Sequence, residues 1–305
     1  MKALVTGATG FVGGRLAAAL AADGAEVRCL VRDRSRAEAL ERVGCELHEG
    51  DALDAGSLRG AGEGVDVAYY LIHSMGRGEG GGFSEREQAA ARNFAQMTKR
   101  AGVEQVVYLG GLGDPGSRHL RSRHETANTL AAEGPPLTYF RAAMVVGWGS
   151  ESFRTLYHLV DRLPVMVAPA WLRTATQPIG VDDVLGYLRL AARTPASRGR
   201  AIEIGGPDVM SYGAMLDTVA RELGKRRPLM VPAPLLTPAL SSRWIGLVTP
   251  VDSGVARPLI EGLSTETVVV DPSGAALFDV HPVPFVETVR SALRERDTEP
   301  IGGLA

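Results

Sequence analysis

The sequence has little cysteine, since Cys29 and Cys45 are the only two in 305 residues. Two cysteines cannot form a disulfide scaffold or a four-cysteine metal site, and both stand in apolar runs where a free thiol usually packs as a small hydrophobic group. His48, His158 and His281 are scattered, without neighbouring carboxylates or cysteines at metal-ligand spacing. We therefore predict no metal site, and we expect a reducing, cytoplasmic location.

An excess of charge is also missing, because 33 lysines and arginines stand against 35 aspartates and glutamates. This balance gives no electrostatic reason to expect binding to nucleic acid or to an anionic membrane. The basic runs at 118–124 and 225–227 are short and have no interleaved aromatic residues. We expect a small-molecule substrate and no nucleic acid, and the sequence leaves the oligomeric state open.

Long hydrophobic runs are absent as well. The first apolar run ends at Gly7, too early for a signal peptide or a membrane span, and no later stretch supplies one. The sequence also has no Gly-x-Ser-x-Gly turn, which carries the nucleophile of many serine hydrolases. We therefore expect neither a membrane partner nor a hydrolase of that class.

Glycine, by contrast, is abundant, with 37 residues. It is used where backbone must turn sharply or lie against a ligand. Over the first 145 residues, short β-branched runs alternate with helical patterns, which is typical of a parallel sheet covered by helices. The predicted strands are 2–6, 26–31, 46–49, 66–72, 105–109 and 138–141, and the predicted helices are 11–22, 35–43 and 84–101. Farther on we predict a helix over 184–192, capped by Asp182 or Asp183.

The strongest motif is a glycine-rich stretch that follows a predicted strand and opens a predicted helix. In this context Gly7 permits the tight turn, Gly10 lets backbone approach a pyrophosphate, and Gly13 lets the helix pack close to the strand. The helix N-terminus presents free amides and a partial positive charge to the phosphates. We predict a dinucleotide site here, with contacts from Gly7, Thr9, Gly10, Phe11, Val12 and Gly13.

Several stretches together resemble an atypical short-chain dehydrogenase/reductase, and more narrowly its NAD(P)H-binding, NmrA-like group. They are residues 6–13, 50–51, 69–75 and 107–112, with weaker matches at 176–179, 181–184 and 203–207. The similarity covers about residues 1–235 and, more loosely, the rest. It implies an α/β fold, a Rossmann-type doubly wound parallel sheet with a smaller C-terminal substrate lobe.

Four segments follow from this resemblance and from a change of pattern after residue 141. We predict a Rossmann core over 1–147, a substrate-lobe insertion over 148–175, a return to the core over 176–210 and a C-terminal substrate lobe over 211–305. Aromatic and apolar residues in the two lobe segments either line a pocket for an apolar or aromatic substrate or simply pack the lobe. These residues are Trp148, Phe153, Tyr157, Trp171, Trp244 and Leu247.

The residues after the second predicted strand bear on the choice of cofactor. An acid there binds the ribose 2′-hydroxyl of NAD, whereas an arginine suits the 2′-phosphate of NADP. Val31 stands where the acid is expected and Arg32 follows it, so we favour NADP(H), with Arg32 first and Arg36 as helper. Asp33 keeps NAD(H) open, because a shift of one residue would restore an acid.

The resemblance implies further cofactor contacts. Asp51, followed by Ala52, matches the family position that accepts from the adenine amino group. Leu71, Ile72 and His73, at the carboxyl end of the fourth strand, are expected beside the ribose and pyrophosphate.

The catalytic set implied by the resemblance is missing. Classical members use a serine together with a Tyr-x-x-x-Lys helix to exchange a proton with the substrate oxygen. Here Gly110 and Gly111 stand where the serine is expected, and the helix motif reads His119 to Arg123. We predict His119 as the acid/base, Arg123 as the group that holds the ribose or a substrate anion, and His73 as a second candidate. We also predict Gly110 and Arg123 as cofactor contacts. The alternative for residues 118–124 is an ordinary solvent-exposed helix face without a catalytic role.

The leading hypothesis is an NADP(H)-dependent oxidoreductase that transfers hydride to or from a small organic carbonyl, enone or quinone-like substrate with a non-standard proton donor. The lost catalytic set also permits a catalytically silent NAD(P)-sensing regulator or assembly protein. A third hypothesis is an isomerase, dehydratase or cyclase on the same fold.

Overall fold

The structure is a computed structural model, and it describes residues 1–72, 83–114, 118–232 and 265–298. A seven-stranded sheet has the order β11-β6-β5-β4-β1-β2-β3, and all of its pairs are parallel. Its strands are β1 (Lys2–Thr6), β2 (Glu26–Val31), β3 (Glu46–Glu49), β4 (Val67–Tyr70), β5 (Gln105–Gly111), β6 (Leu137–Ala142) and β11 (Arg200–Ile204). This order confirms the predicted doubly wound α/β fold.

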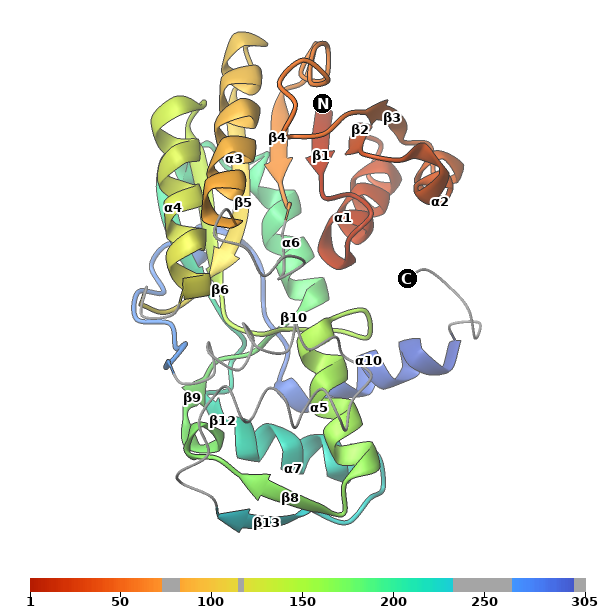
Figure 1. Cartoon of the computed structure of the whole chain (residues 1–305), viewed down its shortest axis with the longest axis vertical. Helices are drawn as coiled ribbons and strands as arrows, with labels where there is room; N and C mark the ends of the chain where they lie inside the picture. The colour runs from red at the N-terminus through yellow and green to blue at the C-terminus, as the bar shows by residue number, and fades with distance from the viewer. Residues whose placement is uncertain (73–82, 115–117, 233–264, 299–305) are drawn as a thin grey trace.

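Helices cover both faces of this sheet (Figure 1). On one face lie α1 (Phe11–Ala22), α2 (Glu38–Arg42) and α6 (Val181–Ala191), and on the other lie α3 (Phe83–Arg100) and α4 (Arg118–Glu133). The predicted bounds of the first helix are confirmed. The predicted helix over 35–43 is instead divided into a 3-10 turn, η1 (Arg34–Arg36), and the short α2, because Asp33 caps the turn at Ser35.

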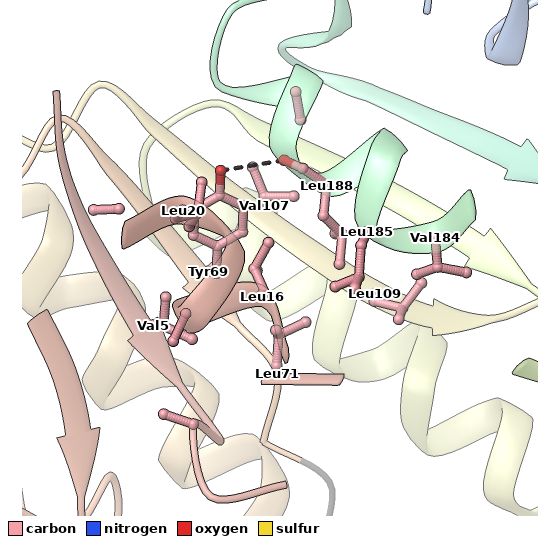
Figure 2. Packing of buried hydrophobic residues seen from close by; sticks show 14 of the residues in the cluster. Val5, Leu16, Leu20, Tyr69, Leu71, Val107, Leu109, Val184, Leu185 and Leu188 are labelled. Atoms are coloured by element: carbon pink, nitrogen blue, oxygen red, sulfur yellow. Dashed lines mark hydrogen bonds between the residues drawn. The ribbon is translucent and has the colours of Figure 1, made fainter. Parts of the chain in front are cut away.

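The core on the α1 side is made by alternate strand residues and the inner faces of α1 and α6 (Figure 2). Tyr69 of β4 is fully buried there, and its hydroxyl donates to the carbonyl oxygen of Leu188 in α6 at 3.2 Å. Burial raises the pKa of the Tyr69 phenol far above its usual range. A hydrogen bond inside an apolar core therefore fixes α6 against the centre of the sheet.

The opposite face is rich in aromatic rings. Tyr70 of β4 packs 5.0 Å from Phe94 of α3 and 5.9 Å from Tyr108 of β5, measured between ring centroids. Tyr108 in turn stacks on Tyr139 of β6 at 5.2 Å. These contacts carry a continuous aromatic layer across three strands beneath α3 and α4.

A second buried cluster lies beyond the carboxyl ends of the strands (Figure 1). It is built from α5 (Glu151–Arg162), α7 (Tyr212–Glu222), α10 (Phe285–Thr298) and the 3-10 turn η2 (Ala170–Arg173). Short strand pairs join it to the sheet or close its far end. They are β7 (Val145–Val146) with β10 (Ile179–Gly180), β9 (Ala175–Thr176) with β12 (Met210–Ser211), and β8 (Val165–Ala168) with β13 (Leu229–Pro232).

The predicted capping of the helix near residue 184 is wrong. The helix begins three residues earlier, at Val181, and its N-cap is Gly180, which has no side-chain cap. Asp183 lies in the first turn, where its carboxylate accepts from the backbone amide of Val283 at 3.2 Å. The acid therefore ties α6 to the chain that leads into α10.

None of the helices in the described part of the chain is both long and apolar enough to cross a membrane.

Replacing Phe140 with alanine tests the packing of the sheet. The ring is fully buried between Tyr187 and Phe278. We expect the free energy of unfolding to fall by about 3–5 kcal/mol in urea titration, because the substitution leaves a cavity. Val270→Ala is the control, since Val270 is 86% exposed and its loss should change stability by less than about 0.5 kcal/mol.

Candidate functional site

The glycine-rich turn joins β1 to α1 at the carboxyl edge of the sheet. Gly7 has φ +65°, and a Cβ there would lie 2.3 Å from the carbonyl oxygen of Leu71. A Cβ on Gly13 would lie 2.2 Å from the carbonyl oxygen of Gly7. Only glycine fits at both positions, so the first turn of α1 lies directly against the ends of β1 and β4.

The hydroxyl of Thr6 fixes the neighbouring strand ends. It donates to the carbonyl oxygen of Tyr69 at 3.1 Å and accepts from the amide of Leu71 at 3.1 Å. Leu71 is buried, and its backbone borders the turn. The turn and the end of β4 thus form one rigid unit.

The N-terminus of α1 is open. Gly10 is the N-cap, no side chain caps the helix, and no acidic residue stands in its first turn. The amides of Phe11, Val12 and Gly13 have no acceptor one turn earlier within the helix. Thr9 and Gly10 are exposed beside them. The partial positive charge and these amides fit a pyrophosphate, which supports the predicted site.

The side chain of Phe11 points away from this site. Its ring packs on the backbone of Gly147 and Gly149, where added Cβ atoms would lie 2.7 Å and 2.6 Å from it. Arg15 stacks over the same ring at 4.5 Å and pairs with Glu295 of α10. The ring of Phe11 is thus used to pack α1 against the chain that leads into α5.

The end of β2 presents exposed arginines beside an aspartate that caps its own turn. The Asp33 carboxylate accepts from the amide of Ser35 at 2.9 Å and from its hydroxyl at 2.6 Å. These two bonds hold the pKa of Asp33 below its usual value. Arg32 is exposed and makes no hydrogen bond or ion pair within the described residues, whereas the neighbouring Arg34 pairs with Glu41 at 2.8 Å. Arg36 is exposed and faces Asp33.

Asp51 lies close to this end of β2, since the amide of Gly50 donates to the carbonyl oxygen of Val31 at 2.9 Å. One carboxylate oxygen of Asp51 accepts from the amide of Leu53 at 2.9 Å. Ala52 is buried, and its carbonyl oxygen accepts from Asn93 of α3 at 2.9 Å. The structure therefore places Asp51 and Arg32 on the same side of the sheet edge, and their roles stay predictions.

Arg123 and Ile72 come together on the α4 side. Both line a cavity of about 20 Å³, which also touches Tyr70, Glu87 and Tyr108. Ser122, next to Arg123 in α4, donates to the Glu87 carboxylate of α3. The Tyr108 hydroxyl lies 3.5 Å from the carbonyl oxygen of Arg123. This polar cluster positions α4 against the end of β4, as a ribose-binding arginine would require.

The side chains of the two predicted catalytic histidines lie outside the described part of the chain. His73 lies outside the described residues. His119 belongs to the first turn of α4, but its side chain also lies outside the description.

Neighbouring side chains fill the space where the serine of classical relatives is expected. A Cβ on Gly110 would lie 2.7 Å from the ring of Tyr139 and 2.9 Å from its hydroxyl oxygen, and a Cβ on Gly111 would lie 2.5 Å from Leu120. Gly110 and Gly111 therefore have a packing role, because the absence of a Cβ leaves room for Tyr139 and Leu120.

Three residues near this point, Arg141, His124 and Tyr139, were not predicted as site residues from the sequence. Arg141 of β6 donates to the carbonyl oxygen of Gly113 at 2.9 Å and pairs with Glu203 of β11 at 3.0 Å. His124 lies 3.3 Å from the same carbonyl oxygen, and its ring meets Tyr139 edge-on. No motif marks them. The only available signal was a tyrosine on one strand beside two glycines that end the next.

Most of the aromatic residues predicted in the substrate lobe pack within or against the second buried cluster. Phe153 is fully buried and Trp171 is 8% exposed, both within the second cluster. Trp148 meets Tyr157 edge-on at 5.2 Å between centroids. Trp244 and Leu247 lie outside the described residues. A separate cavity of about 370 Å³, between α1, α6 and residues 279–281, lies away from the glycine-rich turn and holds none of the predicted site residues.

Comparison with known proteins agrees with this geometry. The sequence model of the NAD(P)H-binding family matches residues 7–140, the span from the glycine-rich turn to β6. This segment is therefore similar to the NAD(P)H-binding family. The predicted resemblance to NmrA-like, atypical short-chain dehydrogenases/reductases is thereby confirmed.

The curated proteins that this chain resembles include a reductase. The chain is 36% identical over 118 residues to sterol demethylase protein B of Methylococcus capsulatus, covering 38% of this chain and 36% of that protein. The chain thus spans about a third of that relative's length. It is 26% identical over 260 residues to a ceramide reductase of Caulobacter vibrioides, covering 83% of this chain and 81% of the relative.

The fold is shared with solved structures. One is the NADPH-dependent quinone oxidoreductase QOR2 of Escherichia coli, solved with NADPH. It has a TM-score of 0.74 and 19% sequence identity, and the alignment covers 95% of this chain and 99% of that one. At this identity the likeness supports the fold alone.

Gly13→Ala tests the close approach at the turn. We expect the added methyl, 2.2 Å from the Gly7 carbonyl oxygen, to lower stability by roughly 1–3 kcal/mol and to weaken nucleotide binding measured by titration calorimetry. The control is Gly186→Ala in α6, where a Cβ would lie 3.4 Å from Val280. This control should raise stability by about 0.5–1 kcal/mol, and equal effects of the two variants would contradict the interpretation.

Gly110→Ser restores the residue type found in classical relatives. We expect it to lower stability by roughly 1–3 kcal/mol in urea titration, because the new side chain collides with Tyr139. In a Tyr139→Ala background the same substitution should cost less than about 0.5 kcal/mol, so a double-mutant cycle should show coupling. Additive effects would mean that the two positions do not compete for space.

Proposed function

We propose that the protein is an NADP(H)-dependent oxidoreductase that transfers hydride to or from a small carbonyl, enone or quinone-like substrate. The observation that carries the proposal is the open N-terminus of α1, bordered by Gly7 and Gly13. Bound there, the nicotinamide cofactor would supply or accept the hydride. The reductase named among the curated relatives supports the same class of reaction.

The preference for NADP(H) rests on the residues after β2. Asp33 uses one carboxylate oxygen, Oδ1, to cap its own turn at Ser35. Arg32 and Arg36 are exposed at the same place. A guanidinium group can donate two parallel charged hydrogen bonds to a 2′-phosphate. The NADPH in the structurally similar quinone oxidoreductase is consistent with this preference.

The proposed substrate is apolar or aromatic. One curated relative is named for a ceramide and another for a sterol, both largely apolar molecules. Trp148 and Tyr157 are partly buried and pack against the second cluster. His119 is the proposed proton donor, with His73 as the second candidate, and Arg123 is the proposed ribose-binding or anion-binding group.

Arg32→Ala tests the choice of cofactor. We expect the affinity for NADPH to fall roughly 10–100-fold, the value of a charged hydrogen bond, while the affinity for NADH stays within about twofold. Arg34→Ala is the matched control, because Arg34 is also exposed but already pairs with Glu41. Equal losses for NADPH and NADH in Arg32→Ala, or no loss, would contradict NADP selectivity.

A panel of ketones, enones and quinones tests the reaction itself, followed by oxidation of NADPH at 340 nm. We expect turnover with at least one conjugated acceptor, and a loss of at least tenfold in kcat for His119→Ala or His73→Ala. Unchanged rates for both variants would remove the histidines from the mechanism. A protein that binds NADPH but oxidises it with no acceptor would instead favour the silent nucleotide-sensing function, which the filled serine position permits.

A further inference from the structure

Tyr139 carries a buried hydroxyl group that the fold leaves unused. The residue is 6% exposed, and its hydroxyl oxygen has no hydrogen-bond partner in the described part of the chain. Buried hydroxyl groups are nearly always paired, because leaving one unpaired costs free energy. The ring alone explains the packing on Tyr108, so a phenylalanine would serve the core equally well. The hydroxyl therefore calls for a separate explanation.

The direction of the side chain gives its position relative to the site. Tyr139 is paired with Tyr108 in the sheet register, yet its hydroxyl lies beside Gly110, two residues nearer the carboxyl end of β5. It would be 2.9 Å from a Cβ at that position. The hydroxyl thus lies at the sheet edge where α/β proteins of this type bind ligands.

Neighbouring groups hold the ring but leave the hydroxyl unpaired. Tyr108 stacks on one side at 5.2 Å, with an angle of 19° between the ring planes, and His124 meets the ring edge-on. The nearby Arg141 uses its terminal nitrogens on Gly113 and Glu203. Burial keeps the phenol in its protonated form by raising its pKa. The hydroxyl is therefore oriented and able to donate one hydrogen bond.

We propose that Tyr139 donates this hydrogen bond to the oxygen atom of the bound hydride acceptor, from the neighbouring strand, in place of a side chain at position 110. The proposal rests on the proposed function. Hydride adds to the acceptor carbon, the electron pair of the C=O bond moves to oxygen, and NADPH becomes NADP⁺. Tyr139 stabilises the charge that develops on oxygen and keeps its own proton, while the proton that completes reduction comes from solvent or His119.

The hydroxyl is enclosed in the structure, which has a bearing on how a ligand reaches it. Leu120 covers Gly111, and His124 borders the Tyr139 ring, so both covering residues come from the first two turns of α4. The proposal therefore requires these two side chains to shift so that a ligand oxygen reaches the hydroxyl. The same enclosure, with the ligand in place, would exclude water and strengthen the hydrogen bond.

Tyr139→Phe tests the proposal, because it removes the hydroxyl and retains the ring. We expect kcat/KM for a quinone to fall roughly 10–100-fold with NADPH as donor. A triarylmethyl cation dye, which accepts hydride at carbon and has no acceptor oxygen, should be reduced at an unchanged rate. The affinity for NADPH should stay within about twofold, and the Tm should be at least that of the wild type, since an unpaired buried group is lost.

Tyr187→Phe is the matched control. Tyr187 is also a buried tyrosine, 3% exposed, but it lies in α6 on the opposite face of the sheet and packs against Phe140. This control should leave quinone reduction unchanged. An equal loss in both variants, or a Tyr139→Phe enzyme with unchanged quinone kinetics, would overturn the proposal.

A binding measurement separates this inference from the proposed function. Calorimetric titration of a quinone into the NADP⁺-loaded protein needs no turnover, and we expect Tyr139→Phe to bind it about tenfold more weakly than the wild type. A wild-type protein that binds no NADP⁺ would contradict the proposed function. A wild-type protein that binds NADP⁺, and binds the quinone no more tightly than Tyr139→Phe does, would overturn the role of Tyr139 alone.

Discussion

The close approach of three backbone segments is the constraint on which the rest of the structure depends. The turn after β1, the first turn of α1 and the end of β4 meet at distances that leave no room for a Cβ on Gly7 or Gly13. The approach sets the angle at which α1 leaves the sheet, and it leaves the helix N-terminus open to an anion. The fold and the proposed binding site thus depend on the same contact, because the glycines that permit the packing also leave the helix amides exposed.

Much of the core could be predicted because it depends on local patterns. The alternation of strands and helices gave the sheet, and the bounds of the first helix followed from glycines at both ends. Competition between local hydrogen bonds made the predicted bounds and caps of two other helices inaccurate. Asp33 caps a 3-10 turn that interrupts the second helix, and Gly180, rather than an aspartate, precedes α6. Both errors arose where a short polar side chain had more than one backbone partner within reach.

The backbone turn of the proposed cofactor site was easier to predict than the surroundings of Gly110. Phosphate binding depends on backbone geometry at a turn, which glycine spacing reveals. The environment of Gly110 depends on Tyr139, which is 29 positions later in the sequence and adjacent only through strand pairing. A sequence pattern cannot show that the space beside a glycine on one strand is filled by a side chain from the neighbouring strand. The same limit applies to Arg141 and His124, which meet at the Gly113 carbonyl oxygen.

The packing of Phe11 between two glycines of the β7–α5 connection has a thermodynamic consequence. Phe11 belongs to the first turn of α1, the proposed nucleotide site, and its ring contacts Gly147 and Gly149, while Arg15 joins the same helix to α10. The second hydrophobic cluster is therefore anchored to the helix that is proposed to bind phosphate. If a nucleotide binds at this turn, it would stabilise both clusters by linkage, so the two should melt as one cooperative unit when the site is saturated.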